Sequence, residues 1–265
     1  MIESLHSPHV ARVKALIGSR GVKERRNSGF FVAEGLQAAR EALSSNSAPF
    51  IKHLYVTNSG LLKLSDYDLN TFDVVEVTDA VMEEMTSTVT PQGVLALCVL
   101  PRPDINEIAA LNNKSALRVI YLHEIQDPGN AGTILRTADA MGVDAVITSP
   151  GSVDMYSPKV VRATAGSLWH VPLYESVPFA ELTALLPAAT PLLMSSHAKK
   201  SITDLSLDNS YISIFGNEAR GVNAATLSSG KITEVTIPMA GRAESLNLSA
   251  AASIVIFTLS PKVAG

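Results

Sequence analysis

The feature that most constrains this fold is a series of short apolar runs, separated by helix-like segments, in the second half of the 265-residue chain. Near-continuous apolar strands are typical of a parallel sheet that helices cover on both faces. The pattern therefore predicts an α/β domain with a parallel sheet. The predicted strands are "LRVIYLHEI" (117–125), "DAVITS" (144–149), "TPLLMSS" (190–196), "YISIFGNE" (211–218) and "EVTIPM" (234–239).

The first half shows a smaller alternation of strands and helices. Residues 5–26 have a basic, helical pattern, and "GFFVAEGLQAAREAL" (29–43) predicts a strand followed by a helix from near Glu34. Further strands are predicted at 51–57, 74–78 and 93–100. Two prolines and polar residues in 101–115 indicate a linker. We therefore predict a small α/β domain over 1–100, a linker over 101–115 and the larger α/β domain over 116–265.

Charge is unevenly distributed along the chain. Residues 1–40 hold seven Lys or Arg and three Glu, whereas the whole chain has a net charge of −4. A basic N-terminal segment followed by an acidic remainder is typical of a protein that binds nucleic acid. A solvent-exposed, charged helix face gives the same pattern. The candidate RNA contacts in this region are Arg12, Lys14, Arg25 and Arg26.

The composition of the chain also indicates the cellular compartment in which the protein is expected to occur. The single cysteine, Cys98, suits a reducing environment. The first residues lack the continuous apolar core of a signal peptide, and the longest apolar run, 249–259, is shorter than the roughly 20 residues that span a bilayer. We expect a cytoplasmic protein without a membrane segment.

The common nucleotide and catalytic motifs are missing from the sequence. No two glycines are two residues apart, so a G-x-G-x-x-G fingerprint cannot occur. Gly216 and Gly221 have the spacing of a P-loop, but Val222 and Asn223 stand where Lys and Ser/Thr are required. The chain has no G-x-S-x-G sequence, and its six histidines are scattered, so neither a nucleophile elbow nor a metal site is predicted.

Three loops follow predicted strands, at the edge where parallel sheets bind ligands. In "DPGNAGTILRTADAMG" (127–142), Asn130 is a suitable N-cap and Gly142 a left-handed C-cap. These preferences leave Arg136 unexplained, unless it is a surface residue paired with Asp139.

The other two loops are "FGNEARGV" (215–222) and "IPMAGRAESLNLSAAAS" (237–253). A glycine directly after a strand lets a ligand approach the backbone, and Glu218 lies two residues beyond that strand. Ser245 or Asn247 is suited to cap a final apolar helix from about Leu246. Taken singly, these residues are explained by capping alone.

Taken in order, the three loops resemble the three sequence motifs of the SpoU-type RNA ribose 2′-O-methyltransferases (TrmH family) of the SPOUT superfamily. The first half is also similar to the ribosomal-protein-like substrate-binding domain of that family, through "GFFVAEGLQAAREAL" and "TPQGVLAL". Val222 and Leu248 depart from the motifs only by apolar exchanges. The resemblance implies a catalytic domain with a deep trefoil knot, a homodimer and S-adenosyl-L-methionine as the cofactor, without a metal.

The resemblance also implies roles for individual residues. The implied catalytic group, in which Arg136 stabilises the developing alkoxide and the others orient it or the ribose, is Arg136, Asn130, Glu218, Ser245 and Asn247. The implied cofactor-binding residues are Gly216, Asn217, Ile237, Met239, Ser245, Leu246, Ser195 and Ser196. Arg162 and Lys159, in "SPKVVRATAGS", are expected to contact RNA phosphate, with a charged helix surface as the alternative.

The function that we predict is transfer of a methyl group from S-adenosylmethionine to a ribose 2′-hydroxyl, with 23S rRNA as the expected substrate. Two other RNA functions stay open, a tRNA 2′-O-methyltransferase and a non-catalytic RNA-binding protein. A small-molecule nucleotide enzyme is disfavoured by the missing glycine fingerprint and P-loop lysine.

Overall fold

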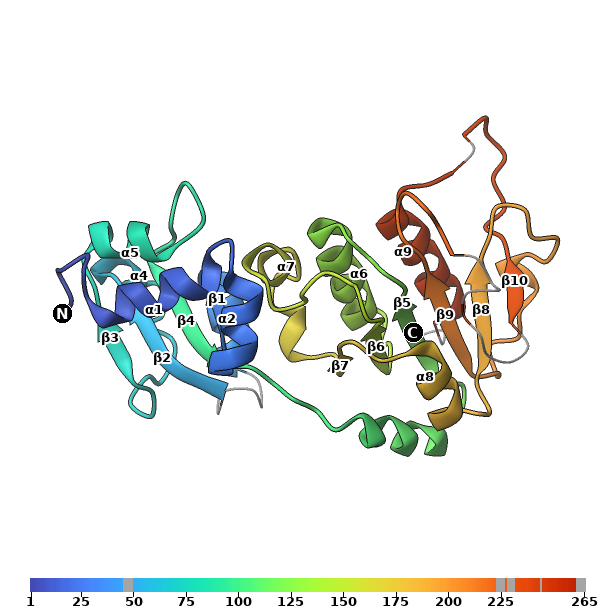
Figure 1. Cartoon of the computed structure of the whole chain (residues 1–265), viewed down its shortest axis with the longest axis horizontal. Helices are drawn as coiled ribbons and strands as arrows, with labels where there is room; N and C mark the ends of the chain where they lie inside the picture. Colours follow the sequence, from blue (N-terminus) through green and yellow to red (C-terminus); the bar gives the residue numbers. More distant parts are fainter. Residues whose placement is uncertain (45–49, 223–226, 228–231, 244, 261–265) are drawn as a thin grey trace. The chain divides into compact units, whose positions relative to one another are not determined.

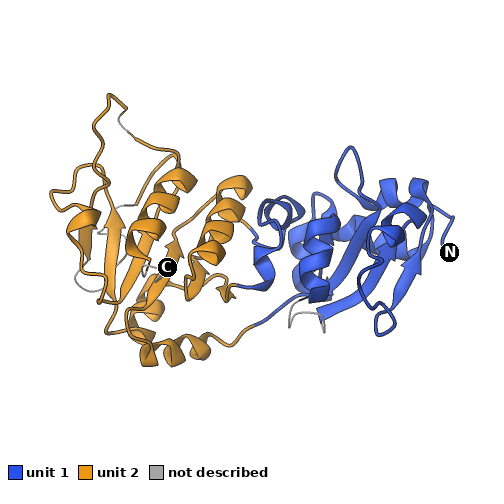
Figure 2. Ribbon diagram, turned by 180° about the vertical axis from the view of Figure 1, so that it is seen from behind, with its two compact units in different colours: residues 1–102, 154–170 blue, residues 103–153, 171–265 orange. Residues whose placement is uncertain are grey.

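The computed structural model describes residues 1–44, 50–222, 227, 232–243 and 245–260 (Figure 1). The chain forms two compact units, coloured separately in Figure 2. The first consists of Met1–Arg102 with Asp154–His170, and the second of Pro103–Val153 with Val171–Gly265.

The first unit is built on a four-stranded mixed sheet with the order β1-β4-β2-β3. β4 pairs antiparallel with both β1 and β2, and β3 is parallel to β2. The strands are β1 (Phe30–Glu34), β2 (Ile51–Val56), β3 (Val74–Glu76) and β4 (Val94–Val99). The helices are α1 (Pro8–Ile17), α2 (Gly21–Ser28), α3 (Leu36–Ser44), α4 (Asn58–Leu62), α5 (Asp79–Met85) and α7 (Pro158–Ala163), followed by the 3₁₀ turn η3 (Ser167–Trp169).

The basic helix predicted over 5–26 is two helices. α1 ends where the Gly18 amide donates to the Lys14 carbonyl, and α2 begins at Gly21. A Cβ at Gly21 would lie 2.4 Å from the Leu16 carbonyl oxygen, so this close turn requires glycine. The buried side chains of α1, Val10, Val13 and Leu16, pack into the core of the unit.

The second unit carries a six-stranded parallel sheet with the order β10-β8-β9-β5-β6-β7. Its strands are β5 (Arg118–Leu122), β6 (Ala145–Thr148), β7 (Leu173–Tyr174), β8 (Thr190–Met194), β9 (Tyr211–Phe215) and β10 (Thr233–Val235). Its helices are η2 (Ile105–Asn113), α6 (Pro128–Ala140), α8 (Phe179–Leu185), η4 (Ile202–Asp204) and α9 (Leu248–Leu259). The predicted parallel α/β domain is confirmed, because all five predicted strands belong to this sheet.

Two segments differ from the domain boundaries expected from the sequence. Residues 154–170, expected in the second domain, belong to the first unit, where the Trp169 indole donates to the Ala38 carbonyl at 3.0 Å. The segment expected as a linker includes η2, which packs on the second unit. Ile108 of η2 is fully buried there, and the Asn112 amide donates to the Leu185 carbonyl at 2.7 Å.

A buried arginine joins β5 to the end of α9. The guanidinium of Arg118, whose residue is 5% exposed, donates to the carbonyls of Leu259, Ala116, Leu117, Asn209 and Leu207. It also lies over the Tyr211 ring, 5.3 Å from the centroid. One side chain thus fixes the last turn of α9 to the loop before β9 and to the start of β5.

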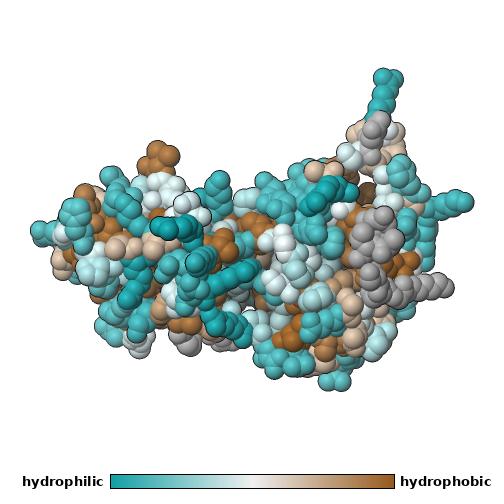
Figure 3. Space-filling view, viewed as in Figure 1, coloured by the Kyte–Doolittle hydropathy of each residue, from teal (hydrophilic) through white to brown (hydrophobic). Residues whose placement is uncertain are grey.

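Hydrophilic and hydrophobic side chains are interspersed on the face of the molecule in Figure 3. Among the described residues, no helix combines the length and apolar character needed to cross a bilayer. The most exposed large apolar side chains include Val89 at 101%, Leu62 at 76% and Phe257 at 71%.

Candidate functional site

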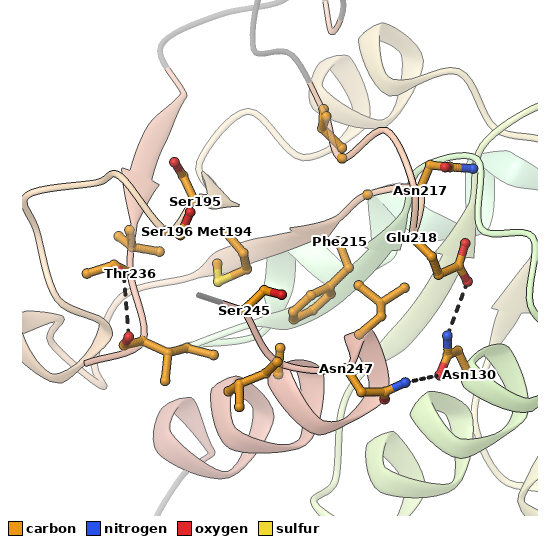
Figure 4. A pocket seen from close by; sticks show the side chains of 18 of the residues that line it. Asn130, Met194, Ser195, Ser196, Phe215, Asn217, Glu218, Thr236, Ser245 and Asn247 are labelled. Carbon is orange, nitrogen blue, oxygen red and sulfur yellow. Dashed lines mark hydrogen bonds between the residues drawn. The ribbon is translucent and has the colours of Figure 1, made fainter. Parts of the chain in front are cut away.

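A pocket lies at the carboxyl ends of β8, β9 and β10, beside the starts of α6 and α9 (Figure 4). Its cavity has a volume of about 720 Å³. It stands at the edge of the parallel sheet where such folds bind ligands. The residues that line it are Asp127, Asn130, Met194, Ser195, Ser196, Phe215, Gly216, Asn217, Glu218, Gly221, Val222, Val235, Thr236, Ile237, Met239, Ser245, Leu246, Asn247, Leu248 and Ala251.

The N-cap of α6 (Pro128–Ala140) lies three residues earlier than predicted. Asp127, not Asn130, is the N-cap, and its Oδ1 accepts a hydrogen bond from the Asn130 amide at 2.7 Å. Pro128 follows at the first helical position, where proline costs no hydrogen bond. Because Asp127 caps the helix, the Asn130 side chain is available to form hydrogen bonds with other residues of the site.

Of the two residues predicted as possible caps of the last helix, Ser245 and Asn247, it is Asn247 that caps α9. Its Oδ1 accepts from the amides of Ser249 at 2.9 Å and Ala250 at 3.3 Å. The same residue's Nδ2 donates to Asn130 Oδ1 at 3.2 Å. The cap therefore also joins the start of α9 to the start of α6, as Figure 4 shows.

Glu218 completes this network from the loop after β9. Its Oε1 accepts from Asn130 Nδ2 at 3.3 Å and from the Asp127 amide at 3.0 Å, and its Oε2 accepts from the Gln126 amide at 3.2 Å. A chain Asn247–Asn130–Glu218 thus runs along one side of the pocket (Figure 4). Each of the three predicted motifs contributes one of its residues.

The carboxylate form of Glu218 is favoured in this setting. Burial opposes ionisation, but hydrogen bonds from backbone amides, including that of Asp127, and from the Asn130 side chain outweigh burial and hold the pKa of Glu218 below its ordinary value of 4.5. A lowered carboxyl pKa stabilises the folded state above the unfolded pKa, and that stability is lost as the pH falls through the folded pKa.

Glu218→Gln tests this arrangement. We expect the wild type to be more stable than the variant at pH values above about 4.5, because only the charged form accepts these bonds at full strength. The difference should shrink as the pH falls below that value. Urea midpoints of both proteins between pH 3 and pH 7 measure it, and a difference that does not change with pH would contradict the assignment.

The residues that were predicted to bind the cofactor all line this one pocket: Gly216, Asn217, Ile237, Met239, Ser245, Leu246, Ser195 and Ser196. In Figure 4, Ser195 and Ser196 lie on the β8 side and Asn217 on the opposite side, with Ser245 between them. Asn217 is 7% exposed, and its Nδ2 donates to the Glu124 carbonyl at 3.0 Å. The pocket therefore combines apolar side chains with hydroxyl and amide groups.

Gly216 is required by packing within the loop that follows β9. A Cβ at this position would lie 2.3 Å from Val222 Cγ2 and 2.7 Å from the Gly221 carbonyl carbon. The loop between them is closed by a hydrogen bond of 2.8 Å from the Gly221 amide to the Asn217 carbonyl. The absence of a side chain lets the loop fold tightly against the end of the strand.

Arg136 is the one predicted catalytic residue that does not line the pocket. It is exposed on α6, and its guanidinium forms no hydrogen bond or ion pair with the residues that the structure describes. Among the described residues of one chain, the wall of the pocket includes no arginine.

The predicted RNA contacts divide into exposed and paired residues. Arg12, Lys14, Arg26 and Lys159 are exposed, although Lys14 forms an ion pair with Glu84. Arg25 is instead buried, 4% exposed, with its Nε 2.8 Å from Asp154 Oδ2 and Nη1 donating to the Leu16 carbonyl. We remove Arg25 from the proposed RNA contacts because its donors are engaged inside the fold.

Arg162 is also paired, but only in part. Its Nη1 donates to Glu34 Oε2 at 3.0 Å and to Ser87 Oγ at 2.6 Å, and its side chain remains 30% exposed. This pair could not be predicted from the sequence, because 128 positions separate Arg162 from Glu34.

Several residues of the pocket wall were not predicted as site residues, including Asp127, Met194, Phe215, Val235 and Thr236. Most of them are the last residues of β8, β9 and β10 or the residue directly after. The strand ends themselves were the signal, because side chains there face the ligand edge of a parallel sheet. Within the described part of the chain, no group of His, Cys, Asp and Glu residues is placed to hold a metal ion.

Comparison with known families gives two matches. The model described as the SpoU rRNA Methylase family matches residues 117–257, and the MRM3-like substrate binding domain matches residues 8–96. The first match contains the loops from α6 to α9 that form the pocket.

Two characterised relatives cover most of the chain. The 23S rRNA (guanosine(2553)-2′-O)-methyltransferase RlmP of Bacillus subtilis is 30% identical over 246 residues, which are 89% of this chain and 91% of the relative. The 23S rRNA (uridine(2479)-2′-O)-methyltransferase of Streptomyces viridochromogenes is 29% identical over 254 residues, 92% of this chain and 86% of the relative.

Among solved structures, the AdoMet-bound rRNA methyltransferase from Sinorhizobium meliloti is similar with a TM-score of 0.80 and 26% identity. The match covers 97% of this chain and 96% of that one. Both units therefore have counterparts in one known chain.

Proposed function

Because the chain belongs to the SpoU rRNA methylase family, we propose that it transfers a methyl group from S-adenosylmethionine to a ribose 2′-hydroxyl of 23S rRNA. One observation carries the proposal beyond family membership. The residues that the family motifs assign to the cofactor come from three separate loops and line a single pocket of about 720 Å³. That volume is within the range of about 300–1,000 Å³ that is usual for cofactor and small-molecule sites.

The residues present fit this cofactor. Ile237, Met239 and Leu246 offer apolar surface for an adenine ring, while Ser195, Ser196 and Asn217 offer polar groups at the other walls. When bound, S-adenosylmethionine supplies an electrophilic methyl group on a sulfonium centre. The task of the chain's own residues is to hold the acceptor hydroxyl in line with that methyl group and to exclude competing geometries.

We assign the stabilisation of the developing 2′-alkoxide to Arg136. A protonated guanidinium lowers the energy of an oxyanion without acting as a base, so the hydroxyl proton passes to a separate acceptor, either water or an RNA phosphate. Arg136 is outside the pocket of its own chain, so we propose a homodimer in which Arg136 of one copy completes the site of the other. The apolar side chains exposed on α9, Ile254 and Phe257, support an interface at that helix.

The remaining predicted catalytic residues act by positioning. Asn247 and Glu218 fix both ends of the Asn130 amide, so that this side chain holds one orientation at the pocket edge. Ser245 lines the same pocket and is assigned to the shape of the loop and to contact with cofactor or ribose.

We further propose a deep trefoil knot at the loops around this pocket, and RNA selection by the domain over 1–100. The exposed Arg12, Lys14, Arg26 and Lys159 are proposed to contact phosphate, which makes RNA binding weaken as salt rises. The single cysteine, Cys98, is free, which suits the cytoplasmic location that we propose for an enzyme of ribosomal RNA.

The proposal is tested by methyl transfer from labelled S-adenosylmethionine to separated 23S rRNA, 16S rRNA and tRNA. We expect label in 23S rRNA. Label confined to tRNA would favour the alternative substrate. Absence of label from every pool, with a protein that binds the cofactor, would favour a non-catalytic RNA-binding protein.

A further inference from the structure

A second cavity, of about 310 Å³, lies entirely within the first unit. It is formed by the end of β1, the first turn of α3, the loop after α5, and α7. Its wall consists of Glu34, Gly35, Gln37, Ala38, Thr88, Thr90, Gln92, Arg162 and Ala165. None of these residues belongs to the proposed methyl-transfer site.

An ion pair at the base of the cavity is held rigidly. Glu34 is 4% exposed, and its carboxylate accepts from the Ser87 amide at 3.1 Å, the Ser87 hydroxyl at 2.9 Å, the Thr88 amide at 3.1 Å and Arg162 Nη1 at 3.0 Å. Glu34 thus accepts four hydrogen bonds inside the unit, three at Oε2 and one at Oε1, and these bonds orient Arg162 at the cavity.

Arg162 has donors to spare. A guanidinium carries five N–H groups, and the hydrogen bonds that the structure describes for Arg162 involve only Nη1. Its Nε and Nη2 groups therefore remain free to bind a ligand in the cavity, and its planar face is fixed by the bonds to Glu34 and Ser87. An oriented guanidinium plane is a surface on which nucleobases stack and to which they hydrogen-bond.

The chemistry of the wall favours a neutral, planar, polar ligand. The charge of Arg162 is balanced by Glu34, and the other polar groups are the amides of Gln37 and Gln92 and the hydroxyls of Thr88 and Thr90. Amides and hydroxyls are the groups that read base edges by hydrogen bonding. The volume is at the low end for ligand sites, which suits a single base.

Two cations, Lys63 and Arg40, are linked by hydrogen bonds to the Gln92 side of the cavity wall. Lys63 Nζ donates to the Gln92 carbonyl at 2.8 Å, and Arg40 Nη2 donates to the Lys63 carbonyl at 2.8 Å. Arg40 Nε is buried and has no hydrogen-bond partner among the described residues. Val89, which lies between Thr88 and Thr90 in the sequence, is fully exposed.

We propose that this cavity receives one unpaired base of the RNA substrate, at a nucleotide other than the one that is methylated. The inference rests on the proposed function, since it names a contact by which the first unit selects its RNA. Arg162 then contacts a base, in place of the phosphate contact expected from the sequence.

The test fills the cavity by Thr90→Trp. Thr90 is exposed, and no hydrogen bond of its side chain is described, so the change leaves the fold intact. We expect the affinity for a 23S rRNA fragment to fall about 10-fold or more, which is the scale of losing one stacked base. Affinity for S-adenosylmethionine and the melting temperature should stay at wild-type values. The matched control is Thr71→Trp, the same substitution at an exposed threonine of the same unit outside the cavity, which should bind RNA as the wild type does.

A second measurement does not depend on any variant's folding. Fragments with a single abasic nucleotide, scanned along the unpaired positions, should reveal one position at which wild-type binding falls and Thr90→Trp binding falls no further. Equal affinities of the two tryptophan variants, or the absence of such a position, would overturn the proposal. Direct RNA binding is read without catalysis, so a wild type that binds RNA but transfers no methyl group would refute the proposed function alone.

Discussion

Arg136→Ala is expected to lower kcat for methyl transfer by about 100- to 1,000-fold while S-adenosylmethionine binds with unchanged affinity. The magnitude is that of removing one preorganised charge stabiliser from a developing oxyanion. Cofactor binding is spared because Arg136 is exposed on α6 and does not line the cofactor pocket of its own chain. Single-turnover kinetics and calorimetry on the same preparation separate the two effects.

Two further variants test whether the loss of kcat in Arg136→Ala is due to the missing positive charge. Arg136→Lys keeps a positive charge and should retain part of the activity, although it loses the planar geometry of arginine. Thr133→Ala changes an exposed position one turn earlier on the same helix and should be active. If Arg136→Ala loses cofactor binding and transfer to the same degree, then Arg136 has a structural role and the electrostatic assignment is wrong.

Arg118→Ala is expected to destabilise the second unit by about 3 kcal/mol or more, because each buried carbonyl left without its donor costs about 1–3 kcal/mol. The variant leaves buried carbonyl groups from three parts of the unit without their donor, among them Leu259 at the end of α9 and Asn209 before β9. The shift in the urea midpoint, followed by circular dichroism, measures the loss.

The control for Arg118 is another cation near the start of the same strand. Lys114 pairs with Asp144 at 2.6 Å, but its side chain is 55% exposed, so Lys114→Ala should cost less than about 1 kcal/mol. Equal losses for the two variants would contradict the view that the buried guanidinium holds α9 in place.

The larger sheet could be predicted from the sequence because most of its strands are near-continuous apolar runs. All five runs named in the sequence belong to it. β7, with only two residues, Leu173 and Tyr174, is too short to show any periodicity. The short helix η2 was predicted as a linker, since the two prolines before it and its own polar residues conceal that Ile108 is buried against the second unit.

Helix starts could be predicted only to within a turn. Asp127 and Asn130 are both good caps, and sequence preference alone does not separate them. Pro128 was the available signal, because proline favours the first helical position and so places the cap at Asp127. The correction matters chemically, since it assigns Asn130 to the pocket network instead of to the helix end.

The motifs predicted where the site lies, but they did not predict which charged side chains are buried or form ion pairs. Arg25 and Arg162 cannot be distinguished from the sequence alone. Arg25 is buried in an ion pair with Asp154, whereas Arg162 forms an ion pair with Glu34 and stays partly exposed. Their partners are 129 and 128 positions away. Contacts at such separation depend on the tertiary fold, which neither local charge nor helical spacing reveals.

The most direct test of the central claim is the chemical position of the transferred methyl group. RNA labelled by the wild-type protein would be hydrolysed in alkali, which cannot cleave next to a 2′-O-methyl ribose, and the products would be separated. The account predicts label in alkali-resistant dinucleotides. Label in mononucleotides would place the methyl group on a base and contradict the assignment of a ribose 2′-O-methyltransferase.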